Sequence, residues 1–308
     1  MVEMLRPCHI PDDWVDATGQ STSPLHIAAQ KGMNAALVHL IENGAVVDRR
    51  DELGLTPLHA AAKSDQVVTA RTLVAAKASL TALVFNKLNP LDITVIQDSL
   101  SLVEFLVRAD PSLRPEAFLL AARDGHFLAI KILLASGVDV DIRNAEGQTA
   151  LVCALSRRHQ IFIYREGNNR RKRVFAADML IHCGADVNVH DQAGETPLTI
   201  AAKQRDVVAV NLLIDTFANV DLPDTSKTTA LMIAVDSANV PLIITLLAAG
   251  ADTSLRDIFG KTAWDRQAFL RGRAKHYHGE VYTRNEIEEL IAQLLPTTLF
   301  CAGIAWEM

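Results

Sequence analysis

The chain has 308 residues, 49% of them hydrophobic, and a formal net charge of −6 at pH 7. A chain of this length can bury roughly three quarters of its unfolded surface, so a single folded domain is expected. The modest negative charge argues against a protein whose main task is to coat nucleic acid. A nucleic-acid partner is therefore not indicated, although local basic clusters occur.

Residues 1–17 come before the first regular pattern, and we expect them to form an N-terminal capping extension. They contain Pro7, Pro11 and Asp12 but no apolar run of signal-peptide length, so secretion is not indicated. Trp14 is a large apolar side chain that would cover the flank of the element that follows.

A short pattern then recurs eight times within residues 18–295, and its clearest copy is TPLHAAA at residues 56–62. The other copies begin at Ser23, Asn89, Glu116, Thr149, Thr196, Thr229 and Thr262. Neighbouring copies start 33 residues apart in five of the seven steps, and 27 and 47 residues apart in the other two. This pattern and period resemble the ankyrin repeat. The resemblance implies an all-α solenoid of stacked helix-turn-helix units with finger-like turns, which usually binds partners and seldom catalyses reactions.

The residue types within the pattern predict a pair of helices in each copy. Thr56 can cap the first helix with its hydroxyl, and Pro57 stands where a helix has no use for an N–H. Apolar pairs such as Leu73-Val74 supply the buried stripe of the second helix. Glycine is expected to end that helix in a left-handed conformation, at Gly44, Gly137, Gly184 and Gly250.

Two departures from the pattern change the expected structure. The histidine of the motif occurs only at His26 and His59, and in this family it ties neighbouring repeats together, so we expect looser coupling after the second repeat. The step of 27 residues lacks six residues and contains Pro111 and Pro115. We therefore expect a finger to be missing between the third and fourth repeats.

Two insertions break the period, at about residues 157–173 in the fifth repeat and 271–285 in the eighth. They hold all three tyrosines and many basic residues: Arg157, Tyr164, Arg170, Arg171, Tyr277 and Tyr282 are the members that we assign to partner binding. The alternative is that both are solvated loops, which repeat proteins tolerate. The basic run 170–173 is expected at the start of a helix, where cations are disfavoured, so an acidic partner, an acidic neighbouring loop or a nuclear-import signal stays open.

The family resemblance also indicates which face would contact a protein partner, since finger tips and the ends of first helices do so in ankyrin-like proteins. At those register positions we assign partner binding to Lys63, Phe85, Ile96, Arg123, Lys203 and Phe259. Large apolar residues at positions that face solvent are candidate anchors, because few interface residues dominate affinity. The alternative is that they pack against a neighbouring finger, and Phe85 is the one most suited to a place in the core.

The sequence gives no sign of a membrane span, a metal site or a cofactor. Asp236, Asn239 and Pro241 divide the most apolar stretch, residues 231–251, where the repeat register requires a turn. The cysteines form no CxxC pair, which suggests reduced thiols in the cytoplasm, with the nucleus left open: Cys8, Cys153, Cys183 and Cys301.

An alternative function is a small-molecule-binding or catalytic protein of the same fold, with a polar pocket lined by Asp92, Thr94, Asp236, Asp265, His276 and His278. His276 and His278 alone do not make a zinc site. Enzyme activity is therefore left undecided, with binding favoured. The apolar C-terminal tail, residues 296–308, is expected to fold back as a cap, or else to dock on a partner or in the concave groove.

Overall fold

The computed structural model of the chain describes residues 22–84, 87–156, 169–237 and 239–270, and every regular element among them is helical. The chain divides into two compact units, residues 1–142 and 143–308. The expected capping extension 1–17, most of the insertion in the fifth repeat, the insertion at 271–285 and the tail 296–308 lie outside the described residues.

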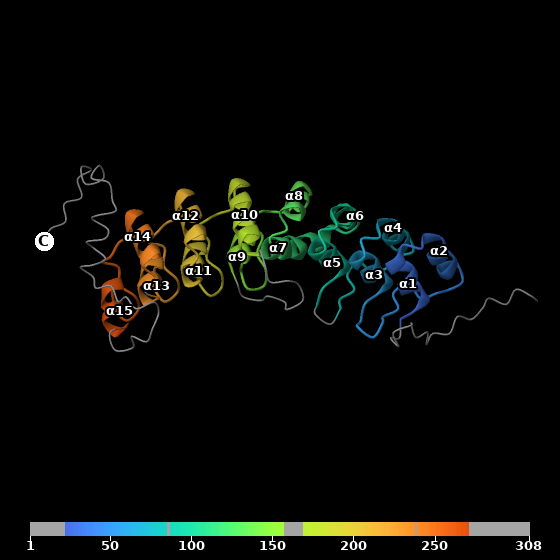
Figure 1. Cartoon of the computed structure of the whole chain (residues 1–308), viewed down its shortest axis with the longest axis horizontal. Helices are drawn as coiled ribbons and strands as arrows, with labels where there is room; N and C mark the ends of the chain where they lie inside the picture. The colour runs from blue at the N-terminus through green and yellow to red at the C-terminus, as the bar shows by residue number, and fades with distance from the viewer. Residues whose placement is uncertain (1–21, 85–86, 157–168, 238, 271–308) are drawn as a thin grey trace, which may run out of the picture. The chain divides into compact units, whose positions relative to one another are not determined.

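The first unit contains four helix pairs and one short 3₁₀ turn (Figure 1). Its elements are α1 Pro24–Lys31, α2 Asn34–Glu42, α3 Pro57–Lys63, α4 Val67–Ala75, α5 Pro90–Ile96, α6 Leu100–Ala109, η1 Pro111–Leu113, α7 Arg114–Asp124 and α8 Phe127–Ala135. The first helices α1, α3, α5 and α7 contact one another in sequence and form one layer, and α2, α4, α6 and α8 form the other.

The second unit repeats this two-layer arrangement. Its helices are α9 Ala150–Leu155, α10 Asn169–His182, α11 Pro197–Lys203, α12 Val207–Asp215, α13 Ala230–Asp236, α14 Val240–Ala248 and α15 Ala263–Leu270. The basic run 170–173 lies in the first turns of α10, as the sequence predicts. The all-α repeat fold expected from the sequence is confirmed.

Buried leucines hold the two layers of each unit together. Six of the seven second helices carry a fully buried leucine at the same register position: Leu73, Leu106, Leu133, Leu180, Leu213 and Leu246. In α2 the fully buried leucine is Leu37, three positions earlier in the register. On the facing first helices, small residues such as Ala61 and Ala62 are also fully buried and allow the layers to approach closely. Each such leucine contributes about 1.5–3 kcal/mol by leaving water, so stability is distributed along the repeats.

Helix ends follow the sequence expectations with two exceptions. Gly44, Gly137, Gly184 and Gly250 follow second helices with φ between +84° and +94°. At the equivalent positions Lys77 and Phe217 adopt φ of +66° and +63°, although they are not glycine. The hydroxyl of Thr56 bonds to Nδ1 of His59 at 2.8 Å, so here it serves the imidazole, whereas Thr196 accepts from the Thr199 amide at 3.1 Å.

The junction between the third and fourth repeats lacks a finger, as expected, but the fourth repeat starts earlier than the sequence pattern indicates. The helix α7 begins at Arg114, directly after the turn η1, and not next to Glu116. The Asp110 carboxylate accepts from the Ser112 amide at 2.9 Å and shapes this turn. A proline near the first position is compatible with a helix start, so Pro115 does not delay it.

Candidate partner-binding face

The finger turns have one shared construction. An aspartate or asparagine accepts, through Oδ1, the amide four residues later, at 2.8 or 2.9 Å: Asp51, Asn144, Asp191, Asp224 and Asp257. The residue three positions on takes a left-handed conformation, and it is glycine in four of these turns and Lys227 in the fifth. Two residues at each tip are thereby held out from the helices, which makes them available for contact.

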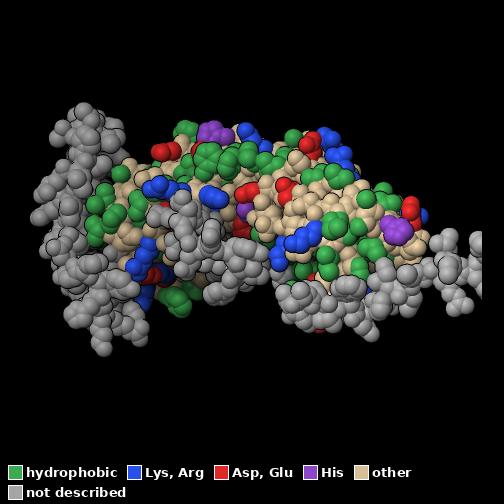
Figure 2. All heavy atoms as spheres, turned by 45° about the vertical axis from the view of Figure 1, so that its right-hand side comes forward, with side chains coloured by type: hydrophobic (Ala, Val, Ile, Leu, Met, Phe, Trp, Pro, Cys, Tyr) green, Lys and Arg blue, Asp and Glu red, His purple; other side chains and the backbone are tan. Residues whose placement is uncertain are grey.

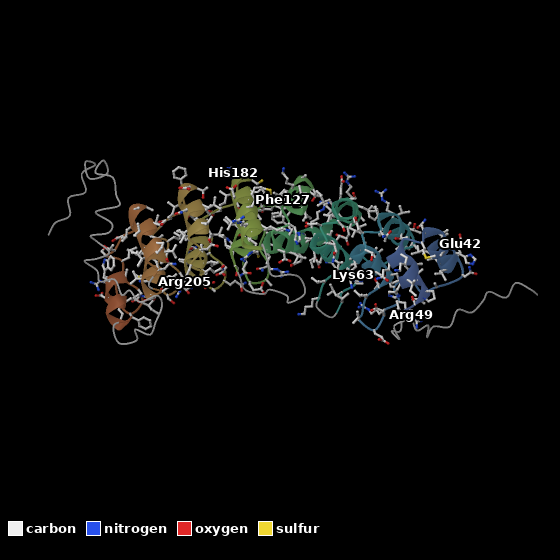
Figure 3. All side chains as sticks on the ribbon, viewed as in Figure 1. Glu42, Arg49, Lys63, Phe127, His182 and Arg205 are labelled. Carbon is white, nitrogen blue, oxygen red and sulfur yellow. The ribbon has the colours of Figure 1, made fainter. Side chains whose placement is uncertain are left out.

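The predicted residues of the first unit lie at equivalent ends of consecutive first helices. Lys63 is exposed at the end of α3, where Figure 3 labels it, and Ile96 is half-buried at the end of α5. Arg123 near the end of α7 pairs with Asp124 at 3.2 Å. Because α3 contacts α5 and α5 contacts α7, these three side chains form a row within the unit. Phe85 lies outside the described residues.

In the second unit, Lys203 stands between two carboxylates. Its Nζ atom lies 2.9 Å from Glu195 and 3.4 Å from Asp224, whose side chains are 9% exposed. Asp224 belongs to the finger of the next repeat, so Lys203 joins two repeats.

A second cation joins the seventh and eighth repeats. Arg266 in α15 donates to Asp257 at 2.7 Å and to Thr228 at 3.2 Å, and it also pairs with Asp236 at the end of α13. Burial by itself would raise the pKa of Asp257, but hydrogen bonds from the Lys261 amide and from Arg266 hold that pKa below its ordinary value. Asp257 is therefore a carboxylate at neutral pH.

The finger tip of the eighth repeat is apolar and exposed. Phe259 is 76% exposed and its neighbour Ile258 is 56% exposed. Arg256 and Lys261 flank this pair in sequence, and the Arg256 side chain is 64% exposed. Two adjacent large apolar side chains with a cation on either side in the sequence fit the pattern of an anchor with a polar rim.

Five of the assigned residues have no described position: Phe85, Arg157, Tyr164, Tyr277 and Tyr282. Arg170 lies in α10 but its side chain is not described, and Arg171 in the same helix is exposed. The structure thus brings together Lys63, Ile96 and Arg123 in one unit. In the other unit it places Lys203 and Phe259 on the same run of repeats.

Three of the four described members of the alternative polar pocket have local structural roles, and the fourth, Asp236, pairs with Arg266 of the next repeat. Asp92 accepts from the Asn89 amide at 2.9 Å and Asp265 from the Thr262 amide at 2.9 Å, so both cap the first turn of their own helix. Thr94 donates to the Leu91 carbonyl at 2.7 Å. No group of three or more His, Cys, Asp or Glu suited to a metal ion occurs in the described part of the chain. His276 and His278 lie outside it.

Sequence reasoning missed Arg256 and Arg266. A signal for the first exists in the sequence, because an arginine directly precedes the finger Asp or Asn at Arg50, Arg143 and Arg256. Arg266 carries no such signal, since its partners come from three different segments of the fold. On the face in view in Figure 2, acidic and basic side chains are interspersed with apolar ones.

A family model described as ankyrin repeats (3 copies) matches residues 1–84, 25–115, 91–164 and 170–257. The chain belongs to the ankyrin-repeat family. The crystal structure of the human ASB11 ankyrin repeat domain is 26% identical and has a TM-score of 0.59, covering 75% of this chain and 99% of that chain. Ankyrin repeats in general mediate protein–protein interaction, so the family supports a protein-binding role.

Two curated relatives match part of this ankyrin-repeat chain. Human "Ankyrin repeat and SOCS box protein 16" is 29% identical over 191 residues, which is 58% of this chain and 40% of that protein. The Escherichia coli putative ankyrin repeat protein YahD is 25% identical over 185 residues, covering 58% of this chain and 88% of YahD. The chain therefore matches less than half the length of the human relative. No helix in the described ranges is long and apolar enough to cross a membrane.

Proposed function

We propose that this chain is a protein-binding scaffold that takes its partner, within each unit, on the ends of the first helices and on the finger tips. The observation that carries the proposal is the Ile258-Phe259 pair, which is held out at a finger tip and is 56% and 76% exposed. An aromatic side chain that buries against a partner gains more than the charged residues around it. Lys63, Ile96, Arg123 and Lys203 would form the surrounding contacts.

The two basic insertions add a second proposed contact region. Tyr164, Arg170, Arg171, Tyr277 and Tyr282 carry this part of the proposal on the sequence alone. Tyrosine buries a large rigid ring while its hydroxyl keeps a hydrogen bond, and arginine binds carboxylates in a bidentate way. An acidic protein surface fits this combination. A cytoplasmic or nuclear setting suits the four widely spaced cysteines, which form no CxxC pair.

Site-specific photo-cross-linking in the native cell tests the scaffold proposal. A benzophenone amino acid replaces Lys63, Lys203 or Phe259, and it replaces Phe217 as the control, since Phe217 is exposed but follows a second helix. We expect one partner to be cross-linked from the three test positions and not from the control. Cross-links from Phe217 alone would contradict the proposed face.

The identified partner then allows a binding measurement. We expect Phe259→Ser to weaken the purified complex at least tenfold, as is usual for an anchor residue, and Lys63→Ala or Lys203→Ala to weaken it less. Deletion of residues 160–171 should weaken binding more at low salt than at high salt, because exposed charges are screened by salt. An unchanged affinity after this deletion would remove the fifth-repeat insertion from the interface.

A further inference from the structure

Two kinds of bond recur between neighbouring fingers of this chain, and both occur together between the fingers of Asn144 and Asp191. The first bond comes from the arginine that precedes the finger Asp or Asn. Arg50 Nη1 donates to Gly54 O at 3.0 Å within its own finger and to Leu83 O of the next finger at 2.6 Å. Arg143 Nη1 does the same, with Gly147 O at 2.9 Å and His190 O at 2.6 Å.

The second bond joins the two backbones. The carbonyl two residues after the finger Asp or Asn accepts an amide of the following finger: Glu146 O accepts from Gln192 N at 3.0 Å, and Ser226 O accepts from Ile258 N at 3.2 Å. The following finger thus takes part with two backbone groups. The C=O of His190 accepts from the arginine, and the N–H of Gln192, two residues later, donates to the carbonyl of the preceding finger.

The finger of the eighth repeat has both groups but neither incoming partner among the described residues. Arg256 Nη1 donates to Gly260 O at 2.6 Å, which repeats the internal bond of Arg50 and Arg143. The same Nη1 atom lies 3.8 Å from the carboxylate of Asp265, whose side chain is exposed. The carbonyl of Phe259, which matches Glu146 and Ser226, receives no hydrogen bond from the described part of the chain.

An extended backbone is the conformation that fits these two groups. In a β-strand, residues j and j+2 point the same way, so the C=O of residue j and the N–H of residue j+2 lie on one edge. A helix engages these groups internally and has none to offer along its length. Addition of an extended segment to an exposed backbone edge is a known mode of peptide recognition, in which side-chain contacts give specificity.

We propose that the finger of residues 256–261 binds an extended segment of the partner protein. The C=O of one peptide residue accepts from Arg256, and the N–H two residues later donates to the carbonyl of Phe259. An apolar peptide side chain covers Ile258 and Phe259, which are exposed beside this edge. Because Arg256 and Lys261 flank the tip, the segment carries net negative charge. This inference rests on the proposed protein-binding function and specifies the partner's conformation and chemistry.

A displayed library of random twelve-residue peptides, selected against the full chain, tests the inference. We expect the recovered peptides to combine an apolar residue with acidic residues and to bind Phe259→Ser at least tenfold more weakly than the parent chain. Phe217→Ser, which removes an exposed phenylalanine from a different part of the same unit, is the matched control and should bind equally well. Recovered peptides that bind Phe259→Ser as tightly as the parent contradict the proposal.

The backbone bonds have their own test. Each amide of the best peptide is methylated in turn, which removes one N–H donor at a time. We expect a loss of at least tenfold at one position, the amide that donates to the carbonyl of Phe259, and little change at the amides on either side of it. A flat profile, or losses spaced three and four residues apart, would show a different mode of binding and sink the extended-segment proposal.

Two further outcomes separate this inference from its alternatives. If the peptides bind a chain truncated to residues 1–295 tenfold more tightly than the full chain, the chain's own residues 296–308 compete for the edge, and the partner assignment is wrong. If the native partner cross-links from Lys63 and Lys203 but its binding does not depend on Arg256 or Phe259, the scaffold function stands and this inference fails.

Discussion

Asp92 and His59 occupy the same position of successive repeats, yet burial acts on them in opposite directions. Burial lowers the pKa of His59 from 6.5 to about 4, and it raises the pKa of Asp92 from 3.8 to about 6. Folding favours the neutral form of His59. Its contribution to the stability of the fold is therefore complete above pH 6.5 and is lost as pH falls through about 4. Folding favours the protonated form of Asp92, so its contribution to stability is complete below pH 3.8 and is lost as pH rises through about 6.

The Oδ1 atom of Asp92 is buried and has no hydrogen-bond partner in the described residues, so its charge is poorly compensated at neutral pH. A shift of about two pKa units corresponds to about 3 kcal/mol. Asp92→Asn keeps an acceptor for the Asn89 amide and should therefore raise the free energy of unfolding by about 1–2 kcal/mol at pH 7.5. Urea denaturation measures this change.

The same variant should become less stable relative to the parent as pH falls. As pH falls from about 6.5 to 4, the parent gains stability from the protonation of Asp92 and loses stability from His59. The Asp92→Asn variant has only the loss from His59. A parent and variant with parallel pH profiles would show that Asp92 is already compensated when folded.

Phe217 takes a left-handed conformation with φ of +63°, and it is 91% exposed. A left-handed backbone costs a non-glycine residue roughly 1–2 kcal/mol, and glycine restores part of that at the expense of about 0.5–1 kcal/mol of chain entropy. We expect Phe217→Gly to stabilise the second unit by about 0.5–1 kcal/mol in urea denaturation. Phe217→Ala, which keeps the strained backbone, should change stability by less than about 0.5 kcal/mol. Equal gains from both would point to the ring as the source of strain.

At the scale of elements, the missing finger is replaced by a short turn and an arginine. Arg114 at the start of α7 donates to Val107 O in α6 at 3.1 Å and to Ser136 O, at the end of α8, at 2.9 Å. Both carbonyls lie near C-terminal helix ends, where a cation is favoured. One side chain thus joins the second helices of two repeats that share no finger contact.

Arg114→Met should destabilise the first unit by about 1–3 kcal/mol, because charge-assisted hydrogen bonds to two carbonyls are lost. Arg108→Met is the control. Its salt bridge to Glu104 is 2.6 Å long but 77% and 52% exposed, so its loss should cost less than about 0.5 kcal/mol. Thermal or urea unfolding followed by circular dichroism measures both, and similar losses in the two variants would contradict the bridging role.

At the scale of the whole molecule, stability should respond to mutation repeat by repeat. Leu213 in α12 is fully buried, and Leu213→Ala should cost about 2–5 kcal/mol. Because each repeat contacts only its neighbours, amide exchange should become faster in α10 to α14 and stay unchanged in α1 to α4. Leu37→Ala is the reciprocal variant, and we expect it to make amide exchange faster in α1 to α4. Uniformly faster exchange along the chain in either variant would indicate one cooperative unit.

The sequence by itself determined the all-α repeat fold, the helix pairs of the described repeats and their glycine-ended second helices, because these depend on local propensity and on a period of 33 residues. It also predicted that a finger is missing between the third and fourth repeats, and it indicated Phe259 as a candidate anchor. Several features depended on the tertiary structure: the early start of α7, the bridge made by Arg114 and the four-residue cluster around Arg266.

Those features arise from groups that are distant in the sequence and meet only when helices stack, so no local pattern encodes them. The two hydrogen-bonding groups of the last described finger on which the extended-segment proposal rests are of the same kind. Arg256 follows a recurring sequence position, but its significance comes from the carbonyls that Arg50 and Arg143 reach in a neighbouring repeat. A hydrogen bond to a backbone carbonyl such as that of Phe259 does not depend on residue type, so only the folded arrangement of fingers reveals that no described residue donates to it.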